Sequence, residues 1–400
     1  MGLGVTAFAF AILFSIALHE LGHLATAKLF GMKATQYFIG FGPRLWSFRR
    51  GETEYGVKAI PAGGYVKIVG MTDLEDLEPQ DEDRAFWRQP APQRAVVLSA
   101  GSAMHFLLAL VLFAIALIAV GVRTGESTTV VDVVSDCVPA TATDECGTDD
   151  PRAPAILAGV RPGDRVVSFA GEPVTGWEEF TRRVRASAPG ALPLVVERDG
   201  AIVDLSVSVV RVERPDLDDP ERTVEVGALG LAPREKIRRY GVLPGLRKTM
   251  TAMGDSFTGT GKALVNLPSS IPKLVKASFG DGERDQQGAV SLIAAGQIAG
   301  SAAKAGLIAE FIALIASLNV FIGVFNLLPL LPLDGGHLAI LGYEQGRKRV
   351  YGLIGRPDPG RVDLRKLLPV AYTFIIFLVA LQVLVLYADI ADPIANPFGG

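Results

Sequence analysis

Two histidines four residues apart, with a glutamate beside the first, are the residues of this 400-residue chain whose spacing most directly suggests chemistry. His19, Glu20 and His23 form an H-E-x-x-H pattern in an apolar N-terminal segment. On a helix, side chains at i and i+4 share a face, so both imidazoles can bind one metal ion. The glutamate then lies at the flank of the metal, where it suits a general base for a zinc-bound water. Two core histidines without a metal are the alternative, which the cost of ionisable groups inside a membrane segment disfavours.

A catalytic zinc ion needs a third protein ligand and an open position for water. The candidates inside or beside apolar runs are Asp334, His337, His105 and Glu310. Asp334 is favoured, because it ends a long uncharged run and precedes Gly335-Gly336, which allow a sharp turn. Pro329 and Pro332 prevent a regular helix just before it. Irregular backbone at membrane depth is tolerated only against protein or a water-filled cavity, as an active site would provide.

The composition indicates a polytopic membrane protein. Hydrophobic residues make up 49% of the chain and charged residues 20%, and the mean hydropathy is positive. Uncharged runs that reach the length of about 20 residues needed to cross a bilayer occur at 95–122, 311–333 and 367–388. The N-terminal run 2–18 reaches that length if its helix continues to about Ala27. A cleaved signal peptide is the alternative, but no basic n-region and no clear cleavage site accompany the run. The sequence therefore predicts four transmembrane helices.

Lys and Arg are concentrated in two connecting loops, one between the first two predicted spans and one between the last two. Because cytoplasmic loops are enriched in these residues, both loops are predicted to be cytoplasmic, with the long segment from 123 to 304 and both termini outside. Cys137 and Cys146 are the only cysteines and fall in that exported segment. An oxidising compartment would permit a disulfide between them, and two free thiols are the alternative.

The loop after the first span has the composition of strands. Residues 53–60 and 65–69 flank Pro61-Ala62-Gly63-Gly64, which predicts a β-hairpin. Such a hairpin could present an edge strand to an unwound peptide, or it could only cover the site.

In the second span, His105 could be a metal ligand, a polar contact across the bundle or a residue facing a wet cavity, and the polar contact is favoured.

The exported segment contains the pattern of a small β-rich domain. A turn-strand-turn at 158–171 precedes a helix predicted over 177–186, and strands at 192–197 and 202–210 flank an Arg198-Asp199-Gly200 turn. This layout resembles a PDZ domain, whose run A-G-[LV]-x-x-G-D matches at 158–164. Such domains capture peptide ends or extended segments in a groove between a strand and a helix, and an unused groove or a size filter is the alternative.

A mixture of basic and apolar residues at helical spacing follows that domain, over 234–279. It predicts one or two amphipathic helices on the outer membrane surface, broken by Pro268 and Pro272. An ordinary domain linker is the alternative.

Several motifs in one chain carry a family resemblance. The motifs are His19-Glu20-x-x-His23, Gly63-Gly64-Tyr65-Val66-Lys67, the exported PDZ-like domain and the run from Asn326 through Pro329 and Pro332 to Asp334-Gly335. Together they resemble the site-2 protease family of intramembrane zinc metalloproteases, in particular actinobacterial members of the regulator-of-sigma-E protease branch. One departure is Gly101-Ser102-Ala103-Met104-His105, where the family usually carries G-P-x-x-N. Asn319 is a candidate for a second family asparagine.

This resemblance implies a set of site residues and a substrate class. It implies Zn²⁺ held by His19, His23 and Asp334, with Glu20 as the catalytic base. It also implies that Asn326 holds the substrate backbone or steadies the tetrahedral intermediate, and that Gly64, Tyr65 and Val66 lie next to the substrate. The implied substrates are single-span membrane proteins such as anti-sigma factors, already shortened outside by another protease, with the PDZ-like domain helping to exclude those not yet cut.

The predicted fold class is a polytopic α-helical membrane protein with four transmembrane helices, a membrane-associated β-hairpin and one exported PDZ-like β-rich domain. The predicted division of the chain is transmembrane helix 1 at 1–30, cytoplasmic-side hairpin and loop at 31–94, transmembrane helix 2 at 95–122, PDZ-like domain at 123–232, exported amphipathic segment at 233–305, transmembrane helix 3 at 306–340, cytoplasmic loop at 341–366, transmembrane helix 4 at 367–390 and a tail at 391–400. The predicted location is a bacterial plasma membrane, with the active site near the cytoplasmic side. The lipid bilayer and the substrate are the expected partners, and no nucleic acid is expected.

The predicted function is hydrolysis of a peptide bond in another protein's transmembrane segment. A zinc-dependent membrane chaperone or scaffold acting through the PDZ-like domain is the alternative, and Glu20 argues against it, because a structural zinc site needs no base. A metal transporter is a further alternative. The exported domain and the scarcity of other His and Asp residues in the spans argue against it.

Overall fold

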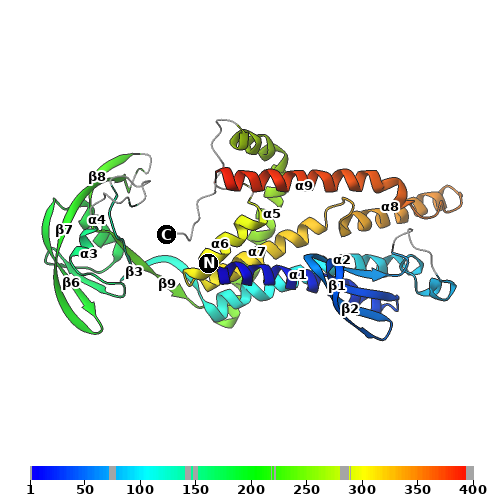
Figure 1. The fold of residues 1–400 in the computed structure, drawn as a ribbon, viewed down its shortest axis with the longest axis horizontal. Coiled ribbons are helices and arrows are strands. Elements are labelled where there is room, and N and C mark those ends of the chain that lie inside the picture. The colour runs from blue at the N-terminus through cyan, green and yellow to red at the C-terminus, as the bar shows by residue number, and fades with distance from the viewer. Residues whose placement is uncertain are drawn as a thin grey trace. The chain divides into compact units, whose positions relative to one another are not determined.

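The computed structural model describes residues 2–71, 78–139, 146, 152–217, 219, 222–279, 288 and 290–392 (Figure 1). Nearly all of the predicted tail at 391–400 lies outside these residues. The chain divides into two compact units. The first, formed by Met1–Gly121 together with Arg239–Gly400, contains the apolar helices, and the second, formed by Val122–Arg238, contains most of the strands.

Four helices of the described residues are long and apolar enough to cross a membrane, which confirms the predicted number. They are α1 (Gly2–Leu29), α2 (Ala91–Ala114) with its π-helical continuation η3 (Ile115–Val120), α7 (Ile308–Asn326), and α9 (Leu368–Ala391) with the preceding turn η4 (Leu364–Leu367). Helix α1 continues without interruption through the H-E-x-x-H turn. Both histidines therefore lie inside a spanning helix.

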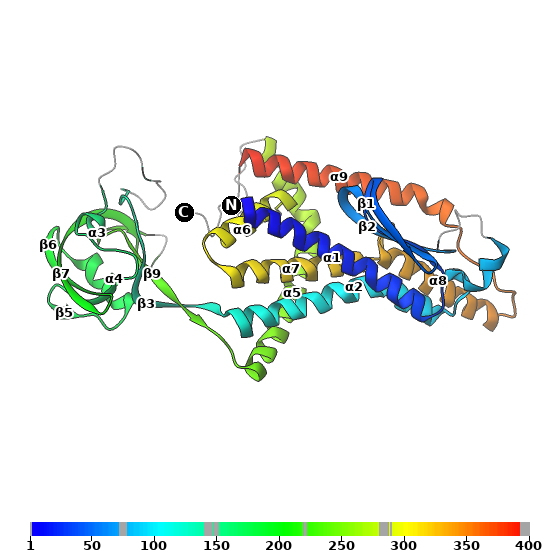
Figure 2. The same cartoon turned by 60° about the horizontal axis from the view of Figure 1, so that its bottom comes forward.

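Small residues bring these helices into close contact. A Cβ atom added at Gly22 of α1 would lie 2.7 Å from the carbonyl oxygen of Ala100 in α2, and one added at Gly323 of α7 would lie 2.5 Å from the ring of Phe106 in α2. Helices without side chains at the contact can approach closely, which is the usual way in which membrane helices pack. Helix α2 thus lies between α1 and α7 in the bundle (Figures 1 and 2).

Helix α5 (Val242–Phe279) runs across the bundle and packs against α2, α7 and α9 (Figures 1 and 2). The prediction of a break at Pro268 and Pro272 is wrong, because one helix of 38 residues continues through both prolines. Tertiary packing holds it: the ring of Phe257 lies 5.0 Å from that of Phe106, and the ring of Phe279 lies 5.0 Å from that of Tyr387. Two more helices complete the unit, α6 (Leu292–Lys304), which packs on α1, and α8 (Asp334–Leu353).

The strands between the first two spans pair differently from the prediction. Strands β1 (Ala34–Arg50) and β2 (Thr53–Ile68) are antiparallel, and the first part of β1 lies between the two halves of β2. Phe38 pairs with Tyr65 on one side and with Gly56 on the other. A direct hairpin between 53–60 and 65–69 is therefore wrong, since β1 separates the two. Two short 3-10 turns, η1 (Pro79–Arg84) and η2 (Phe86–Arg88), lead from this sheet to α2.

The second unit is a curved sheet with the helices α3 and α4 on its inner side (Figure 2). Its elements are β3 (Val122–Val134), α3 (Pro154–Leu157), β4 (Arg165–Phe169), β5 (Glu172–Pro173), α4 (Trp177–Ala186), β6 (Gly190–Arg198), β7 (Ala201–Pro215), β8 (Thr223–Ala228) and β9 (Leu231–Arg238). The strand order is β8-β7-β6-β4-β3-β9, with β5 paired to β4. The predicted helix at 177–186 and the strands on either side of the Asp199 turn are confirmed.

Apolar side chains from the sheet and from α4 form the core of this unit. Phe180 of α4 packs edge to face on Phe169 of β4, and both are buried with Leu194 and Val207. Cys137 and Cys146 are bridged, which confirms the predicted disulfide.

Candidate metal centre

Three side chains that could bind a metal converge at one point of the helical unit. The Nε2 atoms of His19 and His23 are 3.1 Å apart. Asp334 Oδ2 lies 3.2 Å from the first of these atoms and 3.3 Å from the second. The histidines are buried on consecutive turns of α1, and Asp334 is the first residue of α8. The structure therefore brings Asp334 to two histidines that lie more than three hundred positions before it in the chain.

The spacing of these atoms fits a zinc ion. Zn²⁺ in a tetrahedral site binds nitrogen and oxygen at about 2.0–2.1 Å, which separates its ligand atoms by about 3.3 Å. The three measured separations lie at or just below that value. Asp334 Oδ2 is also buried and accepts no hydrogen bond. A buried carboxylate oxygen without a hydrogen-bond donor from the protein is costly, so a cation is the natural partner for this set of atoms.

Each histidine ring is held by helix α2. Nδ1 of His23 donates a hydrogen bond to the backbone carbonyl of Val97 over 2.7 Å, which leaves the lone pair of its Nε2 facing the other ligand atoms. The ring of His19 lies against Gly101, where an added Cβ atom would be only 2.3 Å from Cε1. Neither contact could be found from the sequence, because Val97 acts through its backbone and Gly101 through the absence of a side chain.

A short irregular segment between α7 and α8 positions Asp334. The chain leaves the helical conformation after Asn326 and resumes it at Asp334, as Pro329 and Pro332 predict. A Cβ atom at Gly335 would lie 2.2 Å from the carbonyl oxygen of Leu327, and one at Gly336 would lie 2.7 Å from the backbone of Leu330. The two glycines therefore allow the first turn of α8 to pack directly against the irregular segment.

The second half of β2 lies against Glu20. An added Cβ atom at Gly64 would be 3.1 Å from Glu20 Cγ, and the backbone of Val66 lies near the Glu20 carboxylate. Tyr65, between them, stacks on Phe38 and its hydroxyl donates to Gln36. The backbone of β2 at Gly64 and Val66 therefore lies next to Glu20.

Tyr37 fixes this sheet to α1. Its hydroxyl donates a hydrogen bond to the carbonyl oxygen of Ala17 over 2.8 Å. Burial, together with the nearby charge of Glu20, raises the pKa of Tyr37 to about 12, so the hydroxyl remains a donor at neutral pH. The sequence offered no signal for this residue, since a tyrosine in a strand most often has a packing role.

The remaining sequence candidates lie outside the three-residue cluster. Asn326 is the half-buried last residue of α7. His105 is buried, and its Nδ1 lies 2.8 Å from Asn319 Oδ1. Because the Asn319 amide nitrogen already donates to Ile315, His105 is the donor in this pair, which confirms the predicted polar contact across the bundle. The ring of His105 lies 5.1 Å from that of His19, so it supports a candidate ligand. Within the described residues, neither His337 nor Glu310 joins the cluster.

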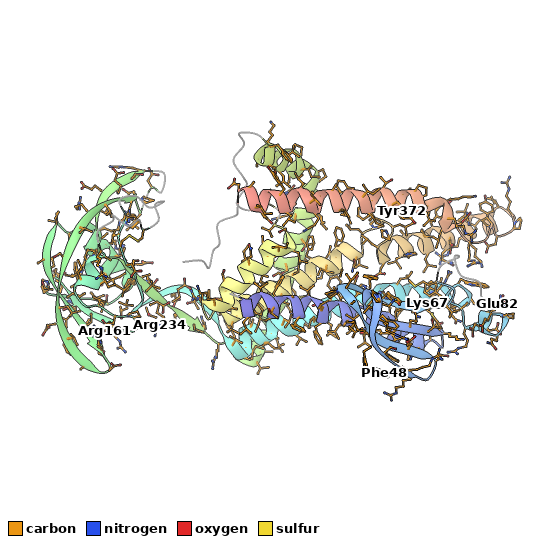
Figure 3. The ribbon with its side chains drawn as sticks, viewed as in Figure 1. Phe48, Lys67, Glu82, Arg161, Arg234 and Tyr372 are labelled. Atoms are coloured by element: carbon orange, nitrogen blue, oxygen red, sulfur yellow. A yellow bond between two sulfur atoms is a disulfide. The ribbon has the colours of Figure 1, made fainter. Side chains whose placement is uncertain are left out.

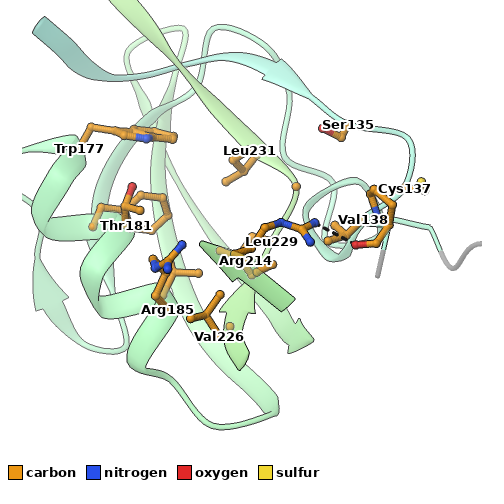
Figure 4. A pocket seen from close by; sticks show the side chains of 16 residues that line it. Ser135, Cys137, Val138, Trp177, Thr181, Arg185, Arg214, Val226, Leu229 and Leu231 are labelled. Carbon is orange, nitrogen blue, oxygen red and sulfur yellow. Dashed lines mark hydrogen bonds between the residues drawn. The ribbon is translucent and has the colours of Figure 1, made fainter. Parts of the chain in front are cut away.

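A separate pocket of about 300 Å³ lies in the β-rich unit, between α4 and the residues that join β8 to β9 (Figure 4). Trp177 and Thr181 of α4 line one side, and Leu229 and Leu231 line another. Two arginines, Arg185 and Arg214, stand at its margin and donate to backbone carbonyls of Pro215 and Pro139. It is an apolar groove with a basic end.

Comparisons with known proteins agree on one protein family. The profile of peptidase family M50 matches residues 7–353, which include all three converging side chains. The chain is 40% identical over 400 residues to zinc metalloprotease Rip1 of Mycobacterium tuberculosis, and 98% of each chain is covered. It is likewise 40% identical to Rip1 of Mycobacterium bovis and 37% identical over 402 residues to Rip1 of Mycolicibacterium smegmatis, again with 98% of each chain covered.

Proposed function

We propose that this chain cuts single-span membrane proteins such as anti-sigma factors within their transmembrane segments. It belongs to peptidase family M50 and is a site-2-type zinc metalloprotease. It is a multi-pass bacterial membrane protein that uses Zn²⁺ and acts on membrane protein substrates. The observation that carries the proposal is the convergence of His19, His23 and Asp334 beside Glu20. In this proposal the reaction is a step of regulated intramembrane proteolysis.

His19, His23 and Asp334 hold the metal ion in this account, and α2 holds the two rings. When bound, Zn²⁺ lowers the pKa of a water molecule and polarises the carbonyl that the water attacks. The hydrogen bond from His23 to Val97 keeps the tautomer that a ligand requires. Gly101 keeps the space that the His19 ring occupies. Both contacts support a site that is formed before the substrate enters.

Glu20 acts as the general base. It follows His19 directly and its carboxylate lies beside the cluster, so it can take a proton from the attacking water and later pass it to the leaving amine. The approach of the Val66 backbone orients the carboxylate.

The edge of β2 at Gly64, Tyr65 and Val66 receives the substrate. A helical substrate hides its carbonyls in its own hydrogen bonds and must be unwound before hydrolysis. An extended segment can then pair with a strand edge, which is β-augmentation. The contact of Gly64 and Val66 with Glu20 supports this position for the cleaved bond. Asn326 is assigned to hold the substrate backbone or the developing oxyanion, on family resemblance and its place before Asp334.

The remaining assignments concern topology. The β1–β2 sheet is membrane-associated and cytoplasmic, the termini and the β-rich unit are outside, and the active site is near the cytoplasmic side. The positive loops support this arrangement. The β-rich unit is assigned to the PDZ-like class, with the groove between α4 and Leu229–Leu231 helping to exclude substrates that have not yet been shortened (Figure 4).

Co-expression with a tagged single-span substrate that lacks its outer domain tests the proposal. The wild type should remove the intact substrate, whereas Glu20→Gln and Asp334→Ala should leave it. Glu310→Gln is a matched control, because it makes the same chemical change in α7 outside the metal cluster. If Glu20→Gln binds zinc and still cuts as the wild type does, the assignment of the base is wrong. If the wild type binds zinc but leaves the substrate intact, the proposed substrate class is wrong.

A further inference from the structure

A second cavity, of about 370 Å³, lies at the end of α1 and is lined by Lys28, Phe48, Arg50 and Tyr55. Its volume falls in the range of roughly 300–1,000 Å³ that is usual for small-molecule sites. Lys28 is fixed there: its Nζ donates to the Tyr55 hydroxyl over 2.8 Å and lies 5.3 Å from the centre of the Tyr55 ring. Phe48 stacks on the same ring at 5.3 Å (Phe48 is labelled in Figure 3). Two cations therefore stand beside one aromatic wall.

Within the described residues, the nearby carboxylates form ion pairs with other cations and not with these two. Between positions 28 and 58 the chain has six Lys or Arg residues and two Glu residues. Glu52 is held by two 2.7 Å hydrogen bonds from Arg84, which lower the pKa of its carboxyl, and Glu54 accepts from Arg44 over 2.7 Å. Within the residues that the structure describes, no carboxylate lies within ion-pair distance of Lys28 or Arg50. The cavity is thus suited to an anion that comes from outside the chain.

The location of the cavity identifies the kind of anion. Lys28 is in the last turn of the spanning helix α1, where a membrane helix meets the polar headgroups. Exposed apolar side chains adjoin the residues of the cavity: Leu29, which follows Lys28, is 77% exposed, Phe48 is 46% exposed, and Trp46, whose ring lies 5.2 Å from that of Phe48, is 61% exposed. Trp and long basic side chains at such a boundary contact lipid with their apolar parts and headgroups with their polar ends. An anion with apolar chains attached matches both features.

We propose that Lys28, Arg50, Phe48 and Tyr55 form a binding site for the phosphate headgroup of an anionic phospholipid. The two cations pair with the phosphate, the aromatic wall covers one side of the headgroup, and the acyl chains extend along the exposed apolar residues beside α1. The site is separate from the metal cluster and requires neither zinc nor cleavage.

Native mass spectrometry of the purified full-length protein in detergent tests this site. Phosphatidylglycerol and phosphatidylcholine are added in turn to the wild type and to the double variant Lys28→Gln/Arg50→Gln. Each basic residue near a membrane surface contributes roughly fivefold to the binding of anionic lipid, so the double variant should lose phosphatidylglycerol by about 30-fold and phosphatidylcholine little. The matched control is Arg349→Gln/Arg356→Gln, which removes two exposed cations from α8 and the loop after it. It should bind phosphatidylglycerol as the wild type does.

Other outcomes would overturn the proposal. Unchanged preference for phosphatidylglycerol in the Lys28→Gln/Arg50→Gln variant would show that these residues form no lipid site, and an equal loss in the control variant would show an effect of net charge alone. Inorganic phosphate that displaces the lipid at equal concentration would identify a phosphate site instead. Should the double variant fold poorly, the charge-keeping variant Lys28→Arg/Arg50→Lys must retain the preference for phosphatidylglycerol, and loss of that preference would contradict the assignment.

Discussion

Replacing Gly101 by alanine should damage the metal centre through a single methyl group. A Cβ atom at this position of α2 would lie 2.3 Å from His19 Cε1 and 2.6 Å from both ring nitrogens. Ordinary contacts begin near 3.4 Å, so the ring or the helix must move by about 1.1 Å. Metal–ligand distances tolerate deviations of only about 0.2 Å. The movement therefore exceeds what the three-residue cluster can absorb.

The expected result is a fall in zinc affinity of about 100-fold, the upper end of the range for changes to groups that orient a ligand. A competition titration with a chromogenic zinc chelator on purified protein in detergent measures it. Gly342→Ala is the matched control, because an added Cβ atom at Gly342 of α8 meets no atom within 4 Å. That variant should bind zinc as the wild type does. Wild-type zinc affinity in a folded Gly101→Ala protein would refute the placement of His19 beside α2 or its role as a ligand.

Three further predictions concern the metal, the bundle and the β-rich unit. A chelator that strips zinc should abolish cleavage in detergent and added zinc should restore it, because Glu20 alone cannot activate water at neutral pH. His105→Leu leaves the buried oxygen of Asn319 without its donor, and should lower the free energy of unfolding by about 1–3 kcal/mol, measured as a lower thermal midpoint. In the β-rich unit, burial opposes ionisation of Asp164, but hydrogen bonds from Arg198 and from the Arg161 backbone hold its pKa below the usual 3.8. This contribution to the free energy of unfolding is fully present above the pKa of Asp164 in the unfolded chain. It is lost as the pH falls through the lower pKa of Asp164 in the folded protein. Protection of β4 and β6 from hydrogen exchange should therefore decrease below about pH 4 in the wild type, after correction for intrinsic rates, and depend less on pH in Asp164→Asn.

The metal cluster was predictable because its chemistry requires particular residue types at particular spacings. His19, Glu20 and His23 follow helical periodicity, and Asp334 follows an uncharged run and precedes two glycines. The four spans were predictable for a similar reason, since bilayer thickness sets the length of an apolar run. In the β-rich unit the bounds of α4 agree with the prediction, because its amphipathic pattern and its flanking turns are local signals.

Features that depend on contacts between distant segments were not predictable. The first part of β1 lies between the halves of β2, although the sequence predicted direct pairing of 53–60 with 65–69. Tyr37 of this part of β1 donates a hydrogen bond to Ala17 of α1, a contact between segments that local sequence does not signal. Helix α5 likewise continues through two prolines because three other helices pack along it. The contacts of Val97 with His23 and of Gly101 with His19 were not predictable either. The first uses a backbone carbonyl and the second depends on the absence of a side chain.

Sequencing the products of one reconstituted reaction locates the peptide bond that this protease cuts. The purified protein and a single-span substrate lacking its outer domain are placed together in liposomes, and mass spectrometry locates the new termini. We expect the wild type to cut within the apolar segment of the substrate, and the Glu20→Gln variant to bind zinc but form no product. A cut confined to residues outside the membrane segment, or an equal yield of product from Glu20→Gln, would contradict this expectation.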